Sequence, residues 1–421
     1  MNNLCMPLHV GTTTCMLPFL LFYIIPNCSL QKLCSNSLQP SQREVMATLA
    51  ASSSFVNNRE GLRPVPDSPQ VNGGDGAYSY SKNSYYQRLA VNVVKENIDD
   101  AIMMKLDLKK LSSGSSKTFC IADLGCAAGP NAILNMQDIM DTIKQKHQLQ
   151  CGPDSKMLHF QVFFNDKLSN DFNTLFSYLP LERQYFAAAV PGSFHTQLFP
   201  ESSVHFMYCS YALHWLSTIP EELLDKNSPA WNKGRIHYSY AADEVINTYA
   251  SGFAKDVENF LDARAKELVV GGMMVIIMPG IPDGMPYSQL TVAVMYDFMA
   301  SIFMDMANEG LMSEEQVDSF NLPIYAASPS EMSALLEKNG QFSIERMELT
   351  NPATWLDGPV DIPVWVMHVR AAMEGMFAKH FGSQIVDEMF SRLSKKLLEH
   401  SDQVQSGYWE RTQLFLILTR K

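Results

Sequence analysis

The chain has 421 residues, of which 46% are hydrophobic and 18% charged, a composition typical of globular proteins. Its formal net charge of −12 and the lack of a dense Lys/Arg cluster argue against nucleic acid and anionic membranes as partners. The length allows one large domain with an insertion, or two domains.

The N-terminal part differs in composition from the rest. Residues 15–30, CMLPFLLFYIIPNCSL, resemble the hydrophobic core of a signal peptide, but no Lys or Arg precedes them. They are also too short for the ~20 apolar residues of a membrane span. Residues 31–70 are rich in Ser, Gln, Asn and Pro and are predicted to be disordered, and Met46 offers an independent start. We predict that residues 1–70 are a leader or disordered extension, with cleaved secretion as the alternative.

Eight cysteines are scattered without CxxC pairs or metal-type spacing. Cys120, Cys126 and Cys209 lie in apolar stretches and are predicted to be buried thiols. This usage favours a reducing compartment, so the predicted location is cytoplasmic.

From residue 84 onward, helical and strand patterns alternate. Helices are predicted over residues 84–106, 133–147, 243–268 and 362–400, and strands over 119–124, 159–166, 185–194, the first part of 204–216, 271–280, FSIERMEL and QLFLILTR. Residues 283–340 are helical and Met-rich, which suggests a cap. The alternation predicts a doubly wound α/β sheet, with a core over residues 71–282, a helical cap over 283–340, and strands and helices over 341–421 that complete the core.

The stretch IADLGCAAGPN, residues 121–131, runs from a predicted strand into a helix. Gly125 and Gly129 bracket a tight turn, and Pro130 suits the first helical position. Such a turn brings the backbone and free N–H groups close to a ligand, so a nucleotide or nucleoside cofactor is expected. The stretch alone leaves open a plain turn in which Asp123 caps the helix.

The spacing of acids distinguishes between cofactors. A dinucleotide site has an acid ~20 residues beyond the turn, whereas Asp166, which ends the second strand, lies roughly twice as far away. GxGxxG and GK[ST] patterns are also missing, which argues against an NAD site and a P-loop. S-adenosylmethionine (SAM) has a ribose diol, an adenine and a cationic sulfonium, which favour carboxylate acceptors. SAM is therefore the predicted cofactor.

Seven motifs occur in the order NGGDGAYSYSKNSYYQ, DLGCAAGPN, FFNDKLSNDFNTLF, VPGSFHTQLFP, CSYALHWLS, WNKGRIH and VDSFNLPIY. Together they resemble the plant SABATH carboxyl methyltransferases, named for salicylate, benzoate and theobromine enzymes. The resemblance covers residues 71–421. It implies the class I methyltransferase fold, a Rossmann-like mixed sheet with a helical cap. It also implies SAM-dependent conversion of a small-molecule carboxylic acid to its methyl ester, and it leaves a homodimer open.

The resemblance implies a set of residues around SAM. The first segment, residues 72–87, contributes Tyr80 and Ser84. The others are Asp123, Cys126 and Asn131 around the methionine part, Asp166 on the ribose hydroxyls, Lys167 beside it, and Ser193 and Phe194 at the adenine. Cys126 is expected to act through its backbone. The family usually has Leu where this chain has Lys167, so contact there is also expected to be largely through the backbone. Without the family resemblance, the same residues allow simpler roles, namely helix capping by Ser84 or Asp166 and core packing by Phe194.

On the acceptor side, the resemblance implies that Gln87 and Trp215 hold the substrate carboxylate, and the indole N–H is a donor only. Tyr211, His214 and Tyr296 are expected to line the same cavity, with His214 in the catalytic group. Salicylate enzymes tend to have Met in place of His214, which argues against salicylate. Several cap methionines, Met285, Met295, Met299 and Met304, suggest adaptable apolar space, so terpenoid, jasmonate-like and indole acids all fit.

Asn232 and the trio Asp318, Phe320 and Asn321 match positions that bind Mg²⁺ in some family members. Oxygen ligands suit Mg²⁺, and Phe320 would offer only its carbonyl. The alternative is a purely loop-stabilising role, and no reaction step requires the ion.

Methyl transfer to a carboxylate is a direct in-line displacement. It needs no general base, because an acid with a pKa near ~4 is already ionised at neutral pH. The nearest alternative is an N-methyltransferase acting on a xanthine-like ring, in which His214 helps to remove a proton. A SAM-binding protein without turnover is a further alternative.

Overall fold

The structure is a computed structural model that describes residues 71–111, 118–152, 158–290, 292–356, 358–408 and 412–421. The predictions for residues 1–70 therefore lie outside the described residues. Within the described residues, no helix has the length and apolar character needed to cross a membrane.

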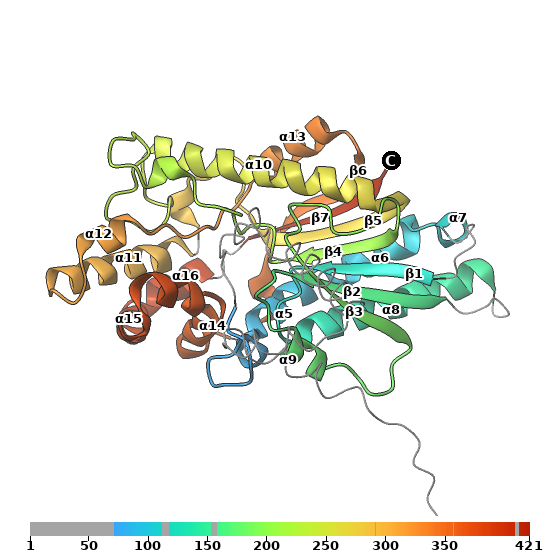
Figure 1. The fold of residues 1–421 in the computed structure, drawn as a ribbon, viewed down its shortest axis with the longest axis horizontal. Helices are drawn as coiled ribbons and strands as arrows, with labels where there is room; N and C mark the ends of the chain where they lie inside the picture. The colour runs from blue at the N-terminus through green and yellow to red at the C-terminus, as the bar shows by residue number, and fades with distance from the viewer. Residues whose placement is uncertain (1–70, 112–117, 153–157, 291, 357, 409–411) are drawn as a thin grey trace, which may run out of the picture. The chain divides into compact units, whose positions relative to one another are not determined.

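A seven-stranded mixed sheet forms the centre of the described chain (Figure 1). The strands are β1 (Thr118–Leu124), β2 (His159–Asp166), β3 (Tyr185–Pro191), β4 (Val204–Ser210), β5 (Leu268–Pro279), β6 (Phe342–Thr350) and β7 (Gln413–Arg420). Their order is β3-β2-β1-β4-β5-β7-β6. The first five are parallel, and β7 pairs antiparallel with both β5 and β6. The seven predicted strands and the predicted α/β fold class are confirmed.

The strand order has a switch point between β1 and β4. From β1 the chain builds β2 and β3 on one side and then crosses to β4 on the other. Such a switch point leaves a crevice above the strand ends, where open α/β sheets bind ligands. The main-chain N–H groups of Gly125 and Cys126 both bond the carbonyl oxygen of Asn165, at 2.9 and 3.0 Å, so the turns after the two strands lie side by side.

Helices cover both faces of the sheet (Figure 1). On one face are α6 (Lys95–Lys105) and α8 (Pro130–Cys151), and on the other α10 (Asp243–Glu267) and α13 (Pro329–Asn339). On α8, Met136, Ile139 and Ile143 repeat at helical spacing and pack in the same cluster as Ile121 of β1. Because the central strands are buried on both faces, they read as continuous apolar runs.

A group of helices beside the sheet forms the cap (Figure 1), and its side chains make a separate apolar cluster. Its helices are α11 (Ala293–Asn308), α12 (Glu314–Asp318), α14 (Ile362–Phe381), α15 (Ser383–Glu399) and α16 (Ser401–Tyr408). Phe303 of α11 stacks on Phe381 of α14, with ring centroids 4.2 Å apart. The cap thus joins helices from residues 283–340 with helices from the C-terminal part, whereas α13 packs against α10.

The predicted single helix over residues 84–106 is wrong. The segment forms α5 (Tyr85–Asn92) and α6, which follow the short helix α4 (Tyr80–Asn83). The break falls at Val93 and Val94, where β-branched residues disfavour the helix. It lets Leu89 of α5 pack in the cap cluster while Ile98 of α6 packs against the sheet.

The remaining short elements are α7 (Leu108–Leu111), α9 (Phe172–Ser177), and the 3-10 turns η2 (Glu221–Leu223), η3 (Tyr287–Gln289) and η4 (Pro352–Trp355). The cysteine prediction holds for Cys126 and Cys209, which are buried. It is wrong for Cys120, which is partly exposed because it lies nearer the start of β1 than the buried residues Ala122 and Leu124 on the same face.

Candidate active site

The turn after β1 needs glycine at one position. Gly125 has φ +81° and Ala127 φ +55°, both in the left-handed region. A Cβ on Gly125 would lie 2.3 Å from the Cβ of Ala212, in the loop after β4, so no larger residue fits without movement. The close approach packs the turn against the β4 loop and shapes the floor of a cavity that both line.

The capping alternatives for the two acids are not what the structure shows. Helix α8 begins at Pro130, as predicted, and its N-cap is Gly129 rather than Asp123. Helix α9 is capped by Asp171, whose carboxylate accepts from the main-chain N–H of Thr174 at 2.9 Å. Neither Asp123 nor Asp166 therefore caps the helix that follows its strand.

Asp123, which is buried, and Asp166, which is partly exposed, are two carboxyl groups close enough for Asp166 to influence the titration of Asp123. Burial, and then the neighbouring Asp166, raises the pKa of Asp123 well above its ordinary value. Burial also raises the pKa of Asp166, while the N–H groups of Lys167 and Ala127, each 2.7 Å from a carboxyl oxygen, partly oppose this. Two neighbouring acidic groups with raised pKa values suit a ligand that donates hydrogen bonds or carries a positive charge.

A cavity above this pair is lined by five of the residues expected at the cofactor: Tyr80, Asp166, Lys167, Ser193 and Phe194. Burial lowers the pKa of Lys167 to about 8, with Asp166 opposing the shift. Lys167 is among the residues that line the cavity, where contact largely through its backbone is expected. Four other expected residues, Ser84, Asp123, Cys126 and Asn131, surround this region without lining the cavity.

Asn131 and Ser84 hold the first segment against the core. The side-chain nitrogen of Asn131 donates to the carbonyl oxygen of Ser84 at 3.0 Å and to its hydroxyl at 3.1 Å. Ser84 precedes α5, but its side chain makes no capping hydrogen bond. The simple capping role is therefore not observed, and Ser84 instead ties the first segment to α8.

The loop that carries Phe194 is held by a buried ion pair on α10. Arg264 Nε lies 2.7 Å from a carboxylate oxygen of Glu267, and both side chains are fully buried. Arg264 also donates to the carbonyl oxygen of Phe194 at 2.6 Å, and Glu267 accepts the main-chain N–H of Phe199 at 2.9 Å. The Phe194 ring packs edge-on against Phe260, at 5.7 Å between centroids, so it serves both the core and the cavity wall.

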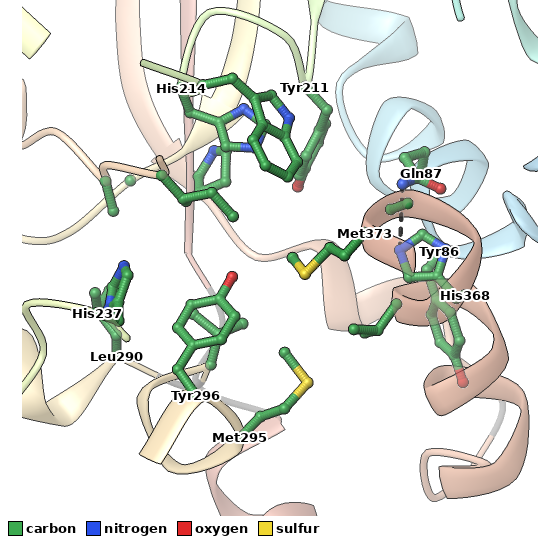
Figure 2. Close-up of a pocket in the computed structure, with 18 of the residues that line it drawn as sticks. Tyr86, Gln87, Tyr211, His214, His237, Leu290, Met295, Tyr296, His368 and Met373 are labelled. Atoms are coloured by element: carbon green, nitrogen blue, oxygen red, sulfur yellow. Dashed lines mark hydrogen bonds between the residues drawn. The ribbon is translucent and has the colours of Figure 1, made fainter. Parts of the chain in front are cut away.

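A second cavity adjoins the first, and Tyr80, Tyr211 and Trp215 line both. All five residues expected on the acceptor side line it: Gln87, Tyr211, His214, Trp215 and Tyr296. Figure 2 shows Gln87 on one side of this space, His214 and Tyr211 on another, and Tyr296 facing them from the cap. The structure therefore brings together the whole set expected on the acceptor side.

Among the described residues that line the acceptor cavity there is no Lys, Arg, Asp or Glu. Burial lowers the pKa of His214 to about 3, and also that of His237 to about 3, so both rings are uncharged near neutral pH. The Tyr211 hydroxyl donates to the side-chain oxygen of Gln413 at 2.8 Å, which fixes the ring.

Several lining residues were missed by sequence reasoning. On α14, Trp365, His368, Val369 and Met373 face the cavity at helical spacing, which is the one signal that could have identified them. His237 was missed although it lies within a quoted motif. Of the cap methionines, Met285 and Met295 line the cavity, whereas Met299 and Met304 pack inside the cap cluster.

Of the four residues matched to a Mg²⁺ site, Asn232 lies in a loop, Asp318 ends α12, and Phe320 and Asn321 follow that helix. The side-chain nitrogen of Asn232 donates to the side-chain oxygen of Asn321 at 2.7 Å, and Asp318 accepts the N–H of Gly234 at 2.7 Å. The amide oxygen of Asn232 is buried without a hydrogen-bond partner among the described residues. Within the same described residues, no group of three or more His, Cys, Asp or Glu side chains could hold a metal. The Phe320 ring packs against Phe377 and Phe381 in the cap.

Comparison with known families identifies close relatives. The model of a family described as SAM dependent carboxyl methyltransferase matches residues 67–421. Loganic acid O-methyltransferase of Catharanthus roseus is 43% identical over 354 residues, which cover 83% of this chain and 94% of the relative. Farnesoic acid carboxyl-O-methyltransferase of Arabidopsis thaliana is 36% identical over 332 residues, covering 79% of this chain and 93% of the relative.

Two further similarities bear on the site. Paraxanthine methyltransferase 2 of Arabidopsis thaliana is 35% identical over 329 residues, covering 78% of this chain and 91% of the relative. Among solved structures, loganic acid methyltransferase with SAH matches with a TM-score of 0.79 at 43% identity, covering 83% of this chain and 98% of that one.

Proposed function

The chain belongs to the family of SAM-dependent carboxyl methyltransferases, and from this premise we propose that its substrate is a bulky, largely apolar carboxylic acid. The enzyme transfers the methyl group of SAM to a small-molecule carboxylic acid and produces the methyl ester. One observation carries the proposal: a cavity lined by Asp166 adjoins a larger and mostly apolar one, with Tyr211 and Trp215 common to both.

In the reaction, a carboxylate oxygen forms a bond to the methyl carbon while the carbon–sulfur bond breaks and its electron pair goes to sulfur. SAM supplies the activated methyl group. The protein needs no general base, since an acid of pKa ~4 is ionised at neutral pH. Its residues act by placement, which holds the carboxylate oxygen close to the methyl group and in line with the breaking bond.

Gln87 and Trp215 are assigned to the carboxylate because both are neutral donors on the wall of the acceptor cavity. The charges of the carboxylate and of the sulfonium cancel as the bond forms. A cationic clamp would therefore stabilise the ground state more than the transition state, and neutral donors avoid this loss. Tyr211 and Trp215 line both cavities, so an acid held there would lie beside the methyl group.

The character of the cavity wall supports a large apolar acid. Besides the carboxylate donors, the lining includes Met285, Leu290, Met295, Trp365 and Met373. Methionine side chains adapt to irregular shapes, which suits a substrate that is neither flat nor small. Farnesoic acid, which the name of one relative gives, is bulky and apolar and is the first candidate to test, whereas loganic acid, which the name of another gives, is a bulky but polar glucoside.

A panel of acids of graded size tests this proposal. We expect kcat/KM to rise from benzoic and salicylic acids towards farnesoic acid, with methyl ester as the product, and loganic acid separates the effect of size from that of apolar character. If small aromatic acids are the best substrates, the proposal of a bulky apolar acceptor is overturned.

N-methylation of a xanthine-like ring is the second candidate, because a paraxanthine methyltransferase is among the relatives. That reaction requires loss of the ring N–H proton. His214 lines the cavity, but a pKa of about 3 makes it a poor base near neutral pH. This argument supports the carboxylate as acceptor.

Mg²⁺ binding is proposed at Asn232, Asp318 and Asn321, with the Phe320 carbonyl as a fourth oxygen. The unpartnered amide oxygen of Asn232 and the oxygen-rich donor set support it. If the ion binds, millimolar Mg²⁺ raises the melting temperature of the unaltered protein but not that of Asp318→Asn. Equal melting curves with and without Mg²⁺ would reject the proposed Mg²⁺ site and favour the loop-stabilising role for these residues.

A cytoplasmic location and a homodimer also stay proposals. The location is supported by Cys120, Cys126, Cys151 and Cys209, which are free thiols. Size-exclusion chromatography with light scattering tests the dimer, and a monomer mass at micromolar concentration would reject it.

A further inference from the structure

A glutamine holds a carboxylate well only if its nitrogen faces the acid. The two ends of the amide are similar in size, and a half-turn about the last bond exchanges the donor with the acceptor. Among the described residues, the oxygen of Gln87 is buried without a partner, and the side chain's hydrogen bond joins Gln87 Nε2 to His368 Nε2 at 3.2 Å (Figure 2). The orientation of Gln87 therefore depends on His368.

The main chain determines which nitrogen of His368 carries the proton. His368 Nδ1 lies 2.9 Å from the carbonyl oxygen of Asn83, the last residue of α4. A carbonyl oxygen only accepts, so Nδ1 carries the hydrogen and Nε2 of the neutral ring is a bare acceptor. A bare acceptor attracts the nitrogen of Gln87 and repels its oxygen.

Helix α14 brings His368 to this place from far along the chain. His368 is 281 residues from Gln87 and 285 from Asn83, and it bonds both. Its ring also packs edge-on against Tyr86, at 5.5 Å between centroids. The imidazole is thereby held between the first segment and the acceptor cavity, whose wall it also forms.

We propose that His368 is a positioning residue for methyl transfer. It orients the amide of Gln87 so that one N–H bonds the imidazole and the second remains for the substrate carboxylate. His368 acts through Gln87 and does not itself need to touch the acid. This inference rests on the proposed function, in which Gln87 anchors the carboxylate.

Two substitutions separate the two hydrogen bonds of His368. His368→Gln keeps an acceptor near the place of Nε2, whereas His368→Asn keeps only a donor near the place of Nδ1. We expect His368→Asn to raise the KM for the acid roughly threefold to tenfold, and His368→Gln to stay within about twofold of the unaltered enzyme. The KM for SAM and the melting temperature should change little in either variant. His368 is only partly buried, so both polar replacements should fold.

A double-mutant cycle with Gln87→Leu decides whether His368 acts through Gln87. Residues that work as a unit are not additive. We expect His368→Asn to add almost nothing once Gln87 is Leu. Additive losses, or an His368→Asn variant with unchanged KM, would overturn the positioning role.

The same cycle keeps this inference apart from the proposed function. If Gln87→Leu alone leaves kcat/KM for the best acid unchanged, the carboxylate role of Gln87 is rejected, and the positioning role with it. A strong effect of Gln87→Leu beside an inert His368→Asn rejects the positioning role alone.

Discussion

The acceptor cavity has polar side chains that donate hydrogen bonds without carrying a charge. Gln87 and Trp215 offer N–H donors, and His214 is kept uncharged by burial, which lowers its pKa to about 3. The cofactor side has the opposite character, since Asp123 and Asp166 are carboxyl groups with raised pKa values. Acidic groups thus lie on the side where the SAM cation is expected. The donors lie in the acceptor cavity, where the substrate carboxylate loses its charge during the reaction, and they are uncharged.

Trp215→Phe should lower kcat/KM for the best acid roughly ten- to hundredfold. The ring bulk stays, but one hydrogen bond to a charged group is lost, worth about 1.5–3 kcal/mol. Steady-state kinetics measures the loss, and SAM affinity serves as the control because it should barely change. Full efficiency in this variant would show that Trp215 does not bind the carboxylate.

Asp166→Asn should weaken SAM binding roughly tenfold or more, because a charged acceptor for the ribose hydroxyls becomes neutral. Calorimetric titration with SAM measures this, and the melting temperature checks the fold. An unchanged dissociation constant in the folded variant would contradict the assignment.

SAM affinity should also depend on pH. The pKa values of Asp123 and Asp166 are raised, so in the free protein these groups take up protons at a higher pH than ordinary carboxyls. A cation binds better to the ionised pair, so affinity should fall as pH drops through the raised pKa values, and binding should release protons. Titrations in buffers of different ionisation enthalpy detect that release, and SAH, which lacks the sulfonium, should show less of it. Binding of SAM without proton release across mildly acidic pH would argue against the carboxyl pair as its partner.

The places of residues in the fold could be predicted from the sequence where the signal is local. The acids that end β1 and β2, and Trp215 in the loop after β4, follow from strand patterns and short motifs. Helical spacing on α14 groups His368 with other cavity residues, but its contacts with Gln87 and Asn83 could not be predicted, because these partners are 281 and 285 residues away. Arg264 and Glu267 are only three residues apart, but their burial and their contacts with the loop after β3 are not visible in the helical pattern.

At the scale of elements, the site depends on how closely the turn after β1 approaches the loop after β4. The strands were predictable because buried parallel strands are apolar and end in marked turns. The helix break at Val93 and Val94 was not, because the apolar spacing continues through it and only the two clusters reveal the change of direction.

Gly125→Ala should abolish SAM binding or lower it severely. The added Cβ would meet Ala212 at 2.3 Å, and φ +81° is strained for alanine. Gly284→Ala is a matched control, since Gly284 also has a positive φ but no atom lies within 4 Å of an added Cβ. Calorimetry and melting curves of both variants measure the difference. Equal, mild effects of the two substitutions would show that close packing at Gly125 is unimportant.

At the scale of the whole molecule, the acceptor cavity is built by segments from both ends of the described chain. The first segment contributes Gln87, the β4 loop Trp215, and α14 His368. The sequence predicted a cap over residues 283–340, but α14 and α15 also pack there, since their apolar faces match α11. Helical periodicity shows that a face is apolar without showing which partner covers it.

Removal of residues 1–45, so that the chain begins at Met46, should leave activity and melting temperature unchanged. The family match begins at residue 67, which places the whole matched region in the shortened chain. Expression of both forms and comparison of kcat/KM provide the measurement. An insoluble or inactive shortened chain would show that the prediction of a dispensable leader is wrong.

The most direct measurement of the central claim is the identity of the methylated atom. The purified enzyme is given methyl-labelled SAM with a mixture of carboxylic acids and xanthines, and the labelled products are identified by mass spectrometry before and after mild alkaline hydrolysis. We predict a labelled methyl ester that alkali returns to the parent acid, at a rate that Trp215→Phe and Gln87→Leu both reduce. Label found only on an alkali-stable ring nitrogen of a xanthine, with the acids untouched, would contradict the account.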